Sequence, residues 1–389
     1  MLPGLYIHIP FCRHKCNYCD FYFTTFLNQA DSFTEALLQE IDLYAKNTKF
    51  QKREFDTVYL GGGTPSVLGL DRISKILDKI RQSFTIVDNV EITIEVNPDS
   101  AKEDFLKEIK ALGFTRISIG VQTFDDQVLR WMNRGHTAQE SCEAITHAKQ
   151  LNFSSVNIDL MHSIPEQSLS DYELSLKKAL QFYPDHFSIY SLTIESNTPL
   201  EKQVHEGKVN ALSEDTSASM MRFTQALLKE AGYTHYELSN YAKSHETRSQ
   251  HNQKYWNFIP YLGLGPSAHS FDGKVRSWNV RNLQKYIEMT REKEFPIEAS
   301  ENIDQEKRFH EEILLGLRKA EGFDFFSVCQ EFQLNPERFQ EPLNSLIDEG
   351  FLKQNGTRIF LTEEGFLVYN SIVRSLMECA NFITERVKQ

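Results

Sequence analysis

The stretch LYIHIPFCRHKCNYC, residues 5–19, joins a short apolar run to three cysteines. The run Leu5–Ile9 has the length and the apolar composition of a buried strand. Cys12, Cys16 and Cys19 follow it with the spacing Cys-x3-Cys-x2-Cys. Because soft thiolates at this density select zinc or iron–sulfur clusters, the stretch predicts a metal centre on the loop after the first strand.

The other cysteines, at positions 142, 329 and 379, lie singly inside amphipathic patterns, which does not fit a disulfide framework. A structural zinc site would need a fourth ligand, which His8 or His14 could supply. A [4Fe–4S] cubane held by three cysteines instead leaves one iron open to a small molecule. The spacing favours the cluster, with zinc as the alternative.

Outward from this loop, the first two hundred residues alternate short apolar runs with helical patterns, which is typical of parallel strands joined by crossover helices. One such helix is expected at 71–84, with Asp71 as its N-cap. The sequence therefore predicts an α/β fold, a partial (β/α)6 barrel. Its six strands are expected at Leu5–Ile9, Asp56–Leu60, Glu91–Val96, Arg116–Val121, Ser155–Leu160 and His186–Leu192.

Polar or glycine-rich residues stand at the ends of these strands, where parallel barrels gather their working groups. The second strand ends in GGGTP, residues 61–65, whose glycines would let a ligand approach the backbone, and no Gly-Lys-Ser/Thr of a phosphate-binding loop follows. Glu95, Gln122 and Asp159 end the next three strands. These acceptors suit ribose hydroxyls and an ammonium group, and Arg134 could bind a carboxylate.

The chain has 389 residues, enough for two or three domains of about 150 residues. Its 42 basic and 54 acidic side chains give a net charge of −12, which disfavours nucleic acids and anionic lipids as partners. No run approaches the roughly 18 apolar residues of a membrane span, and the N-terminus lacks the pattern of a secretion signal. We therefore expect a cytoplasmic protein without a nucleic-acid partner.

Changes in composition predict three parts. Residues 1–235 would form the barrel, 236–300 a connecting region that is irregular at 237–271, and 301–389 a helical domain similar to a winged helix. In the last part, a ribbon with Asn355-Gly356 as its turn would precede a final helix at 364–377. Because this part holds 16 acidic and 10 basic residues, we expect it to pack or to cover a substrate rather than bind DNA.

Five motifs, in order along nearly the whole chain, resemble the HemN/HemW branch of the radical S-adenosylmethionine (SAM) superfamily. They are YIHIPFC (6–12), GGGTPS (61–66), GVQTF (120–124), YELSNY (236–241) and HNQKYW (251–256). The resemblance implies a [4Fe–4S] cluster on Cys12, Cys16 and Cys19, with SAM bound at its open iron. The SAM contacts it implies are Tyr6, Gly62, Gly63, Thr64, Glu95, Gln122, Arg134 and Asp159, with Tyr18 beside the cluster.

Two features separate this chain from the oxygen-independent coproporphyrinogen III oxidases of that branch. Those enzymes have a further cysteine two positions after the third cluster ligand, where this chain has Phe21. They also have a long segment before the first strand, for which we expect no room here. Both departures resemble the haem chaperones of the branch, which hold haem and deliver it to acceptor proteins. The oxidase is the alternative function, and a radical SAM methyltransferase or cyclopropanase is a third.

The HNQKYW motif at 251–256 is the expected haem site. An imidazole, a phenol and an indole within six residues could supply an iron ligand, a hydrogen-bond donor and a stacking wall. We expect His251 to bind the iron beside Tyr255 and Trp256, with His269 as a second candidate. The competing interpretation is a structured surface loop whose aromatic side chains only pack. Expected partners are haem and haem-accepting proteins, with transient membrane-protein contact and a homodimer also considered.

Overall fold

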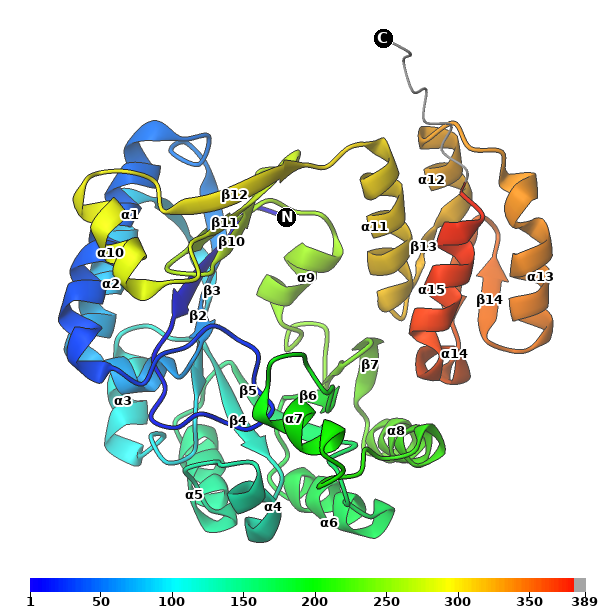
Figure 1. Ribbon diagram of the computed structural model, residues 1–389, viewed down its shortest axis with the longest axis horizontal. Helices are drawn as coiled ribbons and strands as arrows, with labels where there is room; N and C mark the ends of the chain where they lie inside the picture. The colour runs from blue at the N-terminus through cyan, green and yellow to red at the C-terminus, as the bar shows by residue number, and fades with distance from the viewer. Residues whose placement is uncertain (381–389) are drawn as a thin grey trace.

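The computed structural model describes residues 1–380. A large curved sheet with helices along its outside lies beside a smaller helical part in Figure 1. Within the described residues the large sheet has twelve strands, in the order β12-β11-β10-β9-β1-β2-β3-β4-β5-β6-β8-β7. Its parallel centre consists of β1 (Gly4–Ile9), β2 (Glu54–Gly62), β3 (Thr85–Val96), β4 (Arg116–Gln122), β5 (Ser155–His162) and β6 (His186–Ser191).

The fold class predicted from the sequence is confirmed, and each of the six predicted strands is present. β3 begins at Thr85, six residues before the expected start at Glu91. The extension pairs with β2 through Glu54 and Phe55, but its residues are mostly not buried. An extended segment without a buried face has no apolar pattern that would predict it.

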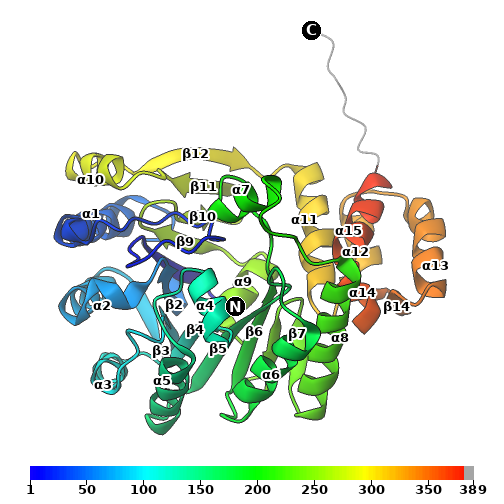
Figure 2. The ribbon, with the colours of Figure 1, turned by 60° about the horizontal axis from the view of Figure 1, so that its bottom comes forward.

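Alternation along the strands separates the core from the inner surface of the sheet. In β1, Leu5, Ile7 and Ile9 are fully buried in the main core, whereas Tyr6 and His8 line a cavity on the opposite face. This is the two-residue period of a strand. Apolar faces of the outer helices complete that core, and Figure 2 shows these helices along one side of the sheet.

The outer helices follow the strands in order. α2 begins at Leu70, and its N-cap is Gly69 at φ +88°, so the predicted cap, Asp71, was wrong and lies within the first turn. The helices between β1 and β7 are α1 (Ala30–Asn47), α2 (Leu70–Ser83), α3 (Glu103–Ala111), α4 (Asp126–Trp131), α5 (Ala138–Gln150), α6 (Leu169–Leu180), α7 (Pro199–His205) and α8 (Glu214–Glu230).

Residues 237–271 were expected to be irregular, but they contain short strands and one helix, and the whole connecting region 236–300 is part of the main body. β9 pairs with β1 and β8 pairs with β6, so the region extends the sheet at both ends. Most of these strands are shorter than the central ones, and the longest, β12, has no buried residue, so none shows a clear apolar alternation. The elements are β7 (Thr234–Glu237), β8 (Asn240–Ala242), α9 (Gln250–Trp256), β9 (Tyr261–Leu264), β10 (His269–Phe271), β11 (Val275–Asn279), α10 (Leu283–Arg291) and β12 (Ile297–Asn302).

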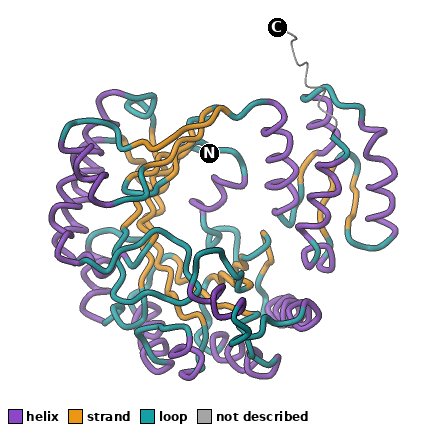
Figure 3. Tube along the Cα trace, in the orientation of Figure 1, coloured by secondary structure: helices purple, strands orange, loops and turns teal. Residues whose placement is uncertain are grey.

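The C-terminal part has its own core and a small sheet in the order β13-β15-β14. The predicted ribbon and its Asn355-Gly356 turn are present, with Gly356 at φ +60°. The predicted final helix is broken at Val368, and residues 381–389 lie outside the described chain. The elements are α11 (Gln305–Arg318), β13 (Phe323–Asp324), α12 (Phe325–Glu331), α13 (Gln340–Asp348), β14 (Leu352–Asn355), β15 (Arg358–Leu361), α14 (Glu363–Leu367) and α15 (Tyr369–Glu378). Figure 3 shows this part as mainly helical.

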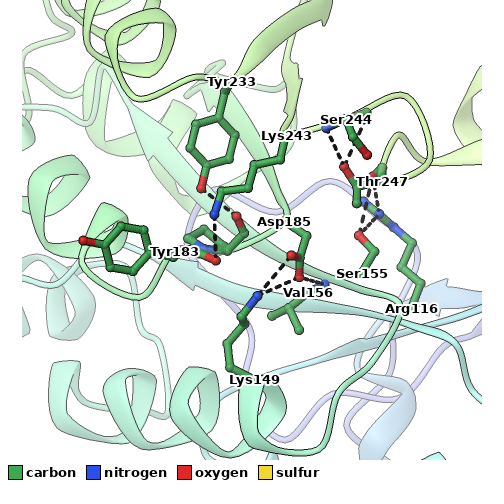
Figure 4. Close-up of polar contacts among 11 residues, drawn as sticks. Arg116, Lys149, Ser155, Val156, Tyr183, Asp185, Tyr233, Lys243, Ser244 and Thr247 are labelled. Carbon is green, nitrogen blue, oxygen red and sulfur yellow. Dashed lines mark hydrogen bonds and ion pairs between the residues drawn. The ribbon is translucent and has the colours of Figure 1, made fainter.

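The segment that leads into α9 is held to the starts of the central strands, as Figure 4 shows. Arg116 at the start of β4 donates to the Thr247 carbonyl at 2.9 Å and to the Ser155 hydroxyl on β5. Asp185 accepts from Lys149 and from the backbone N–H of Val156, each at 3.0 Å. The bond from Arg116 to Thr247 therefore holds the chain just before α9 against the start of β4. In the described part of the chain, no helix is long and apolar enough to cross a membrane.

Candidate functional site

A cavity of about 630 Å³ opens where the central strands end. The cysteine loop forms one wall, and residues from the ends of β2 to β6 form the others. The structure brings into this cavity the three cysteines and all but one of the residues predicted to contact SAM. Those residues are Tyr18, Gly62, Gly63, Thr64, Glu95, Gln122, Arg134 and Asp159.

Tyr6 is the residue that the structure separates from this set. Its hydroxyl lies 3.1 Å from Nδ1 of His8, and its side chain lines a second cavity with Tyr255 and His269. The assignment of Tyr6 to SAM therefore rests on the resemblance alone.

The cysteine loop is tied to the strand ends around it. The Thr64 hydroxyl lies 3.6 Å from Sγ of Cys12, and a guanidinium nitrogen of Arg134 lies 3.6 Å from Sγ of Cys16. Burial raises the pKa of Cys12 to about 11, and burial also raises the pKa of Cys19. Metal binding at these thiols would therefore release protons. A guanidinium beside three thiolates suits a negatively charged cluster.

The geometry disfavours His8 as a fourth zinc ligand, whereas His14 lines the main cavity and stays a candidate. Both ring nitrogens of His8 have partners, because Nε2 lies 2.9 Å from the Tyr22 carbonyl and Nδ1 contacts Tyr6. Within residues 1–380, no three His, Cys, Asp or Glu side chains are grouped so that they could hold one ion. The thiolates of a cubane each bind a different iron, so they need not converge on a single point.

The glycines of the GGGTP segment are required by the packing of the protein itself. Gly62 has φ +109°, and a Cβ there would lie 2.6 Å from the ring of His8. A Cβ on Gly63 would lie 2.6 Å from the backbone oxygen of Phe11. The prediction that these glycines admit a ligand stays untested, but they do let the end of β2 lie against the cysteine loop.

Two partly buried carboxylates line the cavity, and neither forms an ion pair with a cationic side chain of the described chain. Glu95 accepts from the Tyr59 hydroxyl at 2.7 Å and from the backbone N–H of Gly62 at 3.1 Å. Asp159 accepts from the Ser118 hydroxyl at 3.0 Å and from the Asn157 amide at 2.7 Å. Burial raises the pKa of Glu95 to about 7 and that of Asp159 to about 6. Partly buried carboxylates with raised pKa values favour a positively charged ligand, such as an ammonium or a sulfonium group.

The end of β4 carries backbone strain next to these groups. Gln122 has φ +66°, and the pairing of β4 with β5 shifts register between Gly120 and Gln122. Strained backbone in a non-glycine residue is concentrated at ligand sites. Arg134 donates to the Gly120 carbonyl at 2.9 Å and to Oδ1 of Asn97 at 2.7 Å, which fixes the guanidinium at this point.

Some residues of the cavity wall were not predicted from the sequence. Asn97 also donates to the Thr64 hydroxyl at 3.1 Å and so connects the cysteine loop to Arg134. Tyr59 and Ser118 hold the two carboxylates. These residues could have been found from the sequence, because a polar residue at every second position of an otherwise apolar strand, such as Ser118 in β4, indicates a polar inner face.

The predicted haem ligand His251 is buried, with 1% of its surface exposed. Its Nδ1 lies 2.8 Å from the Thr57 hydroxyl, and its Nε2 lies 2.9 Å from the Tyr255 hydroxyl. Iron could bind this imidazole only if one of these contacts broke. The motif residues form α9 rather than a surface loop, and the geometry favours the interpretation that His251 stabilises the fold.

The rest of α9 connects distant parts of the chain. Lys254 is buried and pairs with Asp56, and it donates to the Leu2 carbonyl at 2.7 Å. The guanidinium carbon of Arg318, at the end of α11, lies 4.1 Å from the ring centroid of Trp256. Tyr255 is the motif aromatic that lines the second cavity.

Comparisons with known proteins agree with this architecture. The model of the radical SAM superfamily matches residues 6–179, and the model of the HemN C-terminal domain matches residues 303–368. A protein of Bacillus subtilis named heme chaperone HemW is 32% identical over 376 residues, covering 95% of this chain and 98% of its own length. The Escherichia coli protein of the same name is 33% identical over 387 residues, covering 95% and 97%.

A solved structure shares nearly the whole fold. Coproporphyrinogen III oxidase (HemN) from Escherichia coli, described as a radical SAM enzyme, superposes with a TM-score of 0.82 at 25% identity. The match covers 97% of this chain and 90% of the oxidase.

Proposed function

This chain belongs to the HemW family of radical SAM proteins, and from that premise we propose that it is a haem chaperone carrying a SAM-bound [4Fe–4S] cluster. Similarity to proteins named heme chaperone over nearly their full length carries the proposal. A second observation supports it. Phe21, at the position where the oxidases have a cysteine, is 71% exposed at the edge of the main cavity.

Cys12, Cys16 and Cys19 would hold three irons of the cluster and leave the fourth for SAM. A bound cluster and SAM together give access to radical chemistry. The chain would position SAM through opposite charges: Arg134 would bind its carboxylate, and Glu95 and Asp159 would bind its positive groups and ribose hydroxyls. The two partly buried carboxylates that line the cavity, with their raised pKa values, are consistent with a small charged cofactor.

The partners proposed on the same basis are haem and haem-accepting proteins. We propose no nucleic-acid partner, because a net charge of −12 disfavours binding to a phosphate backbone. We expect the protein to be located in the cytoplasm. We also expect transient contact with membrane-bound acceptors and the formation of a homodimer.

Two assays on the same reconstituted protein test the chaperone against the oxidase. We expect haem titration to give a saturable Soret band at about one haem per chain. We expect no conversion of coproporphyrinogen III above background with cluster, SAM and reductant present. The close superposition on the oxidase makes this second assay necessary. Multiple turnovers would establish the oxidase, and a failure to bind haem at micromolar concentrations would refute the chaperone.

A further inference from the structure

A second cavity of about 330 Å³ lies beside the main one and has a different chemistry. Asp20 and Phe21 line both cavities, so the segment after the cysteine loop separates them. The walls of the second cavity are mainly aromatic, and they also hold the imidazoles of His8 and His269 and the guanidinium of Arg281. They include Tyr6, Tyr22, Tyr255, Tyr261, His269 and Arg281.

His269 differs from the two other histidines near this cavity. It is exposed, and no hydrogen bond to either ring nitrogen is found in the described chain. His8 and His251 have both nitrogens engaged. The ring of His269 stacks on Trp278, with centroids 5.8 Å apart and planes at 24°. Although one side of the ring is exposed, partial desolvation and the nearby Arg276 lower the pKa of His269, which favours the neutral imidazole that metals bind.

The backbone holds His269 in a fixed position. It lies on β10 opposite Trp278 of β11, and a Cβ on Gly263 would meet the His269 carbonyl oxygen at 2.0 Å. The turn before β10 is fixed by Glu40, which accepts from the backbone N–H of Gly265 at 2.7 Å. A ligand on a strand supported in this way is better positioned than one on a free loop.

Arg281 provides a cation at the same cavity. Its guanidinium lies 3.3 Å from a carboxylate oxygen of Asp20, and both side chains are about half exposed, at 53% and 54%. An exposed ion pair of this kind contributes little to stability, so the guanidinium can be shared with an arriving carboxylate. Planar carboxylates are the groups that arginine binds in a bidentate manner.

We propose that the second cavity binds haem, with His269 as an axial iron ligand, Arg281 on a propionate and the tyrosines against the macrocycle. This inference rests on the proposed chaperone function and identifies the haem-binding site that the function requires. The volume lies at the low end of the roughly 300–1,000 Å³ range of ligand pockets, so one edge of the macrocycle would remain in solvent. An exposed edge suits a protein that must release haem to an acceptor. Phe21, exposed between the two cavities, offers further apolar surface.

The test is titration of the full chain with haemin, followed by absorption and electron paramagnetic resonance spectra. In His269→Ala, the Soret band should shift and the dissociation constant should rise at least tenfold, and free imidazole should restore the original spectrum. Arg281→Gln should raise the dissociation constant several-fold without moving the Soret band. The matched control is His245→Ala, an exposed histidine away from the cavity, which should behave as the unmodified chain.

The outcomes separate this site from the chaperone function itself. If the unmodified chain binds no haem, the chaperone proposal fails. If it binds haem and His269→Ala has an unchanged spectrum and affinity, the site is wrong while the chaperone proposal survives. If His269→Ala fails to fold, His269→Tyr replaces it and should give a spectrum typical of tyrosinate ligation. An imidazole-type spectrum in His269→Tyr would overturn the assignment.

Discussion

Single residues decide whether the cysteine loop can hold a cluster. Cys16→Ser should reduce reconstituted iron and sulfide from about four of each per chain to near zero, because a cubane held by three cysteines loses a ligand. The fold should persist, since Cys16 is not in the core. Iron and sulfide analysis with circular dichroism measures both. Cys142→Ser, a half-buried cysteine outside the loop, should keep the full cluster. Full iron content in Cys16→Ser would refute the ligand assignment.

A second prediction for a single residue concerns the charge of Asp159. Asp159→Asn keeps the shape of the side chain but removes the negative charge that faces the cavity. SAM binding, measured by equilibrium dialysis, should weaken by about 1–3 kcal/mol, the cost of losing one charge-assisted hydrogen bond. Asp71→Asn, on the exposed first turn of α2, should leave SAM affinity unchanged. Equal affinities in the two variants would remove Asp159 from the SAM site.

At the scale of elements, α9 is stabilised by contacts that composition could not reveal. His251→Ala would leave the Thr57 and Tyr255 hydroxyls without their partner, so the free energy of unfolding should fall by about 1–3 kcal/mol. Because neither nitrogen of His251 is free, the haem spectrum of this variant should be unchanged. Denaturant unfolding and haem titration check the two parts. A shifted Soret band would restore His251 as the iron ligand.

Glu40 makes the link between α1 and the β9–β10 turn dependent on pH. Burial raises its pKa to about 7, above the usual value of 4.5. A carboxyl with a raised pKa favours the folded state below about pH 4.5, and this stabilisation is lost as the pH rises through 7. Between pH 5 and 8 the unmodified chain should therefore lose stability relative to Glu40→Gln, by on the order of 1–3 kcal/mol. Glu35→Gln, exposed on the same helix, should follow the unmodified chain; a constant difference for Glu40→Gln would contradict the mechanism.

For the whole molecule, the sequence could predict whatever has a local pattern. The six central strands were predictable because each buries an apolar face, and strand-end residues such as Gln122 could be assigned to one edge by topology. Strands β7–β12 show no apolar period, because most are very short and β12 has no buried residue, and α9 has no apolar repeat. The partners of His251 could not be foreseen, because Thr57 lies far away in the chain and meets it only in the folded sheet.

One ion pair with a buried carboxylate and several more exposed ion pairs join the C-terminal part to the main body, together with apolar contacts of Met221 and Leu238. Nε of Arg318 lies 2.6 Å from a carboxylate oxygen of Glu237, although the two are not aligned for a hydrogen bond, and Glu237 is fully buried. Backbone bonds from Leu238 to Arg318 and from Ala320 to Tyr236 accompany it. Removal of the guanidinium would leave a buried carboxylate without its cation.

Arg318→Ala should therefore lower the free energy of unfolding by about 3–5 kcal/mol, whereas removal of an exposed pair at the same junction should cost less than about 1 kcal/mol. Arg222→Ala is the matched control, because Arg222 on α8 pairs with Glu364 on α14 and both side chains are about half exposed. Calorimetry checks both values. Since each part has its own core, Arg318→Ala should also separate unfolding into two transitions. A single transition with a loss as small as that of Arg222→Ala would show that apolar packing, and not this ion pair, holds the two parts together.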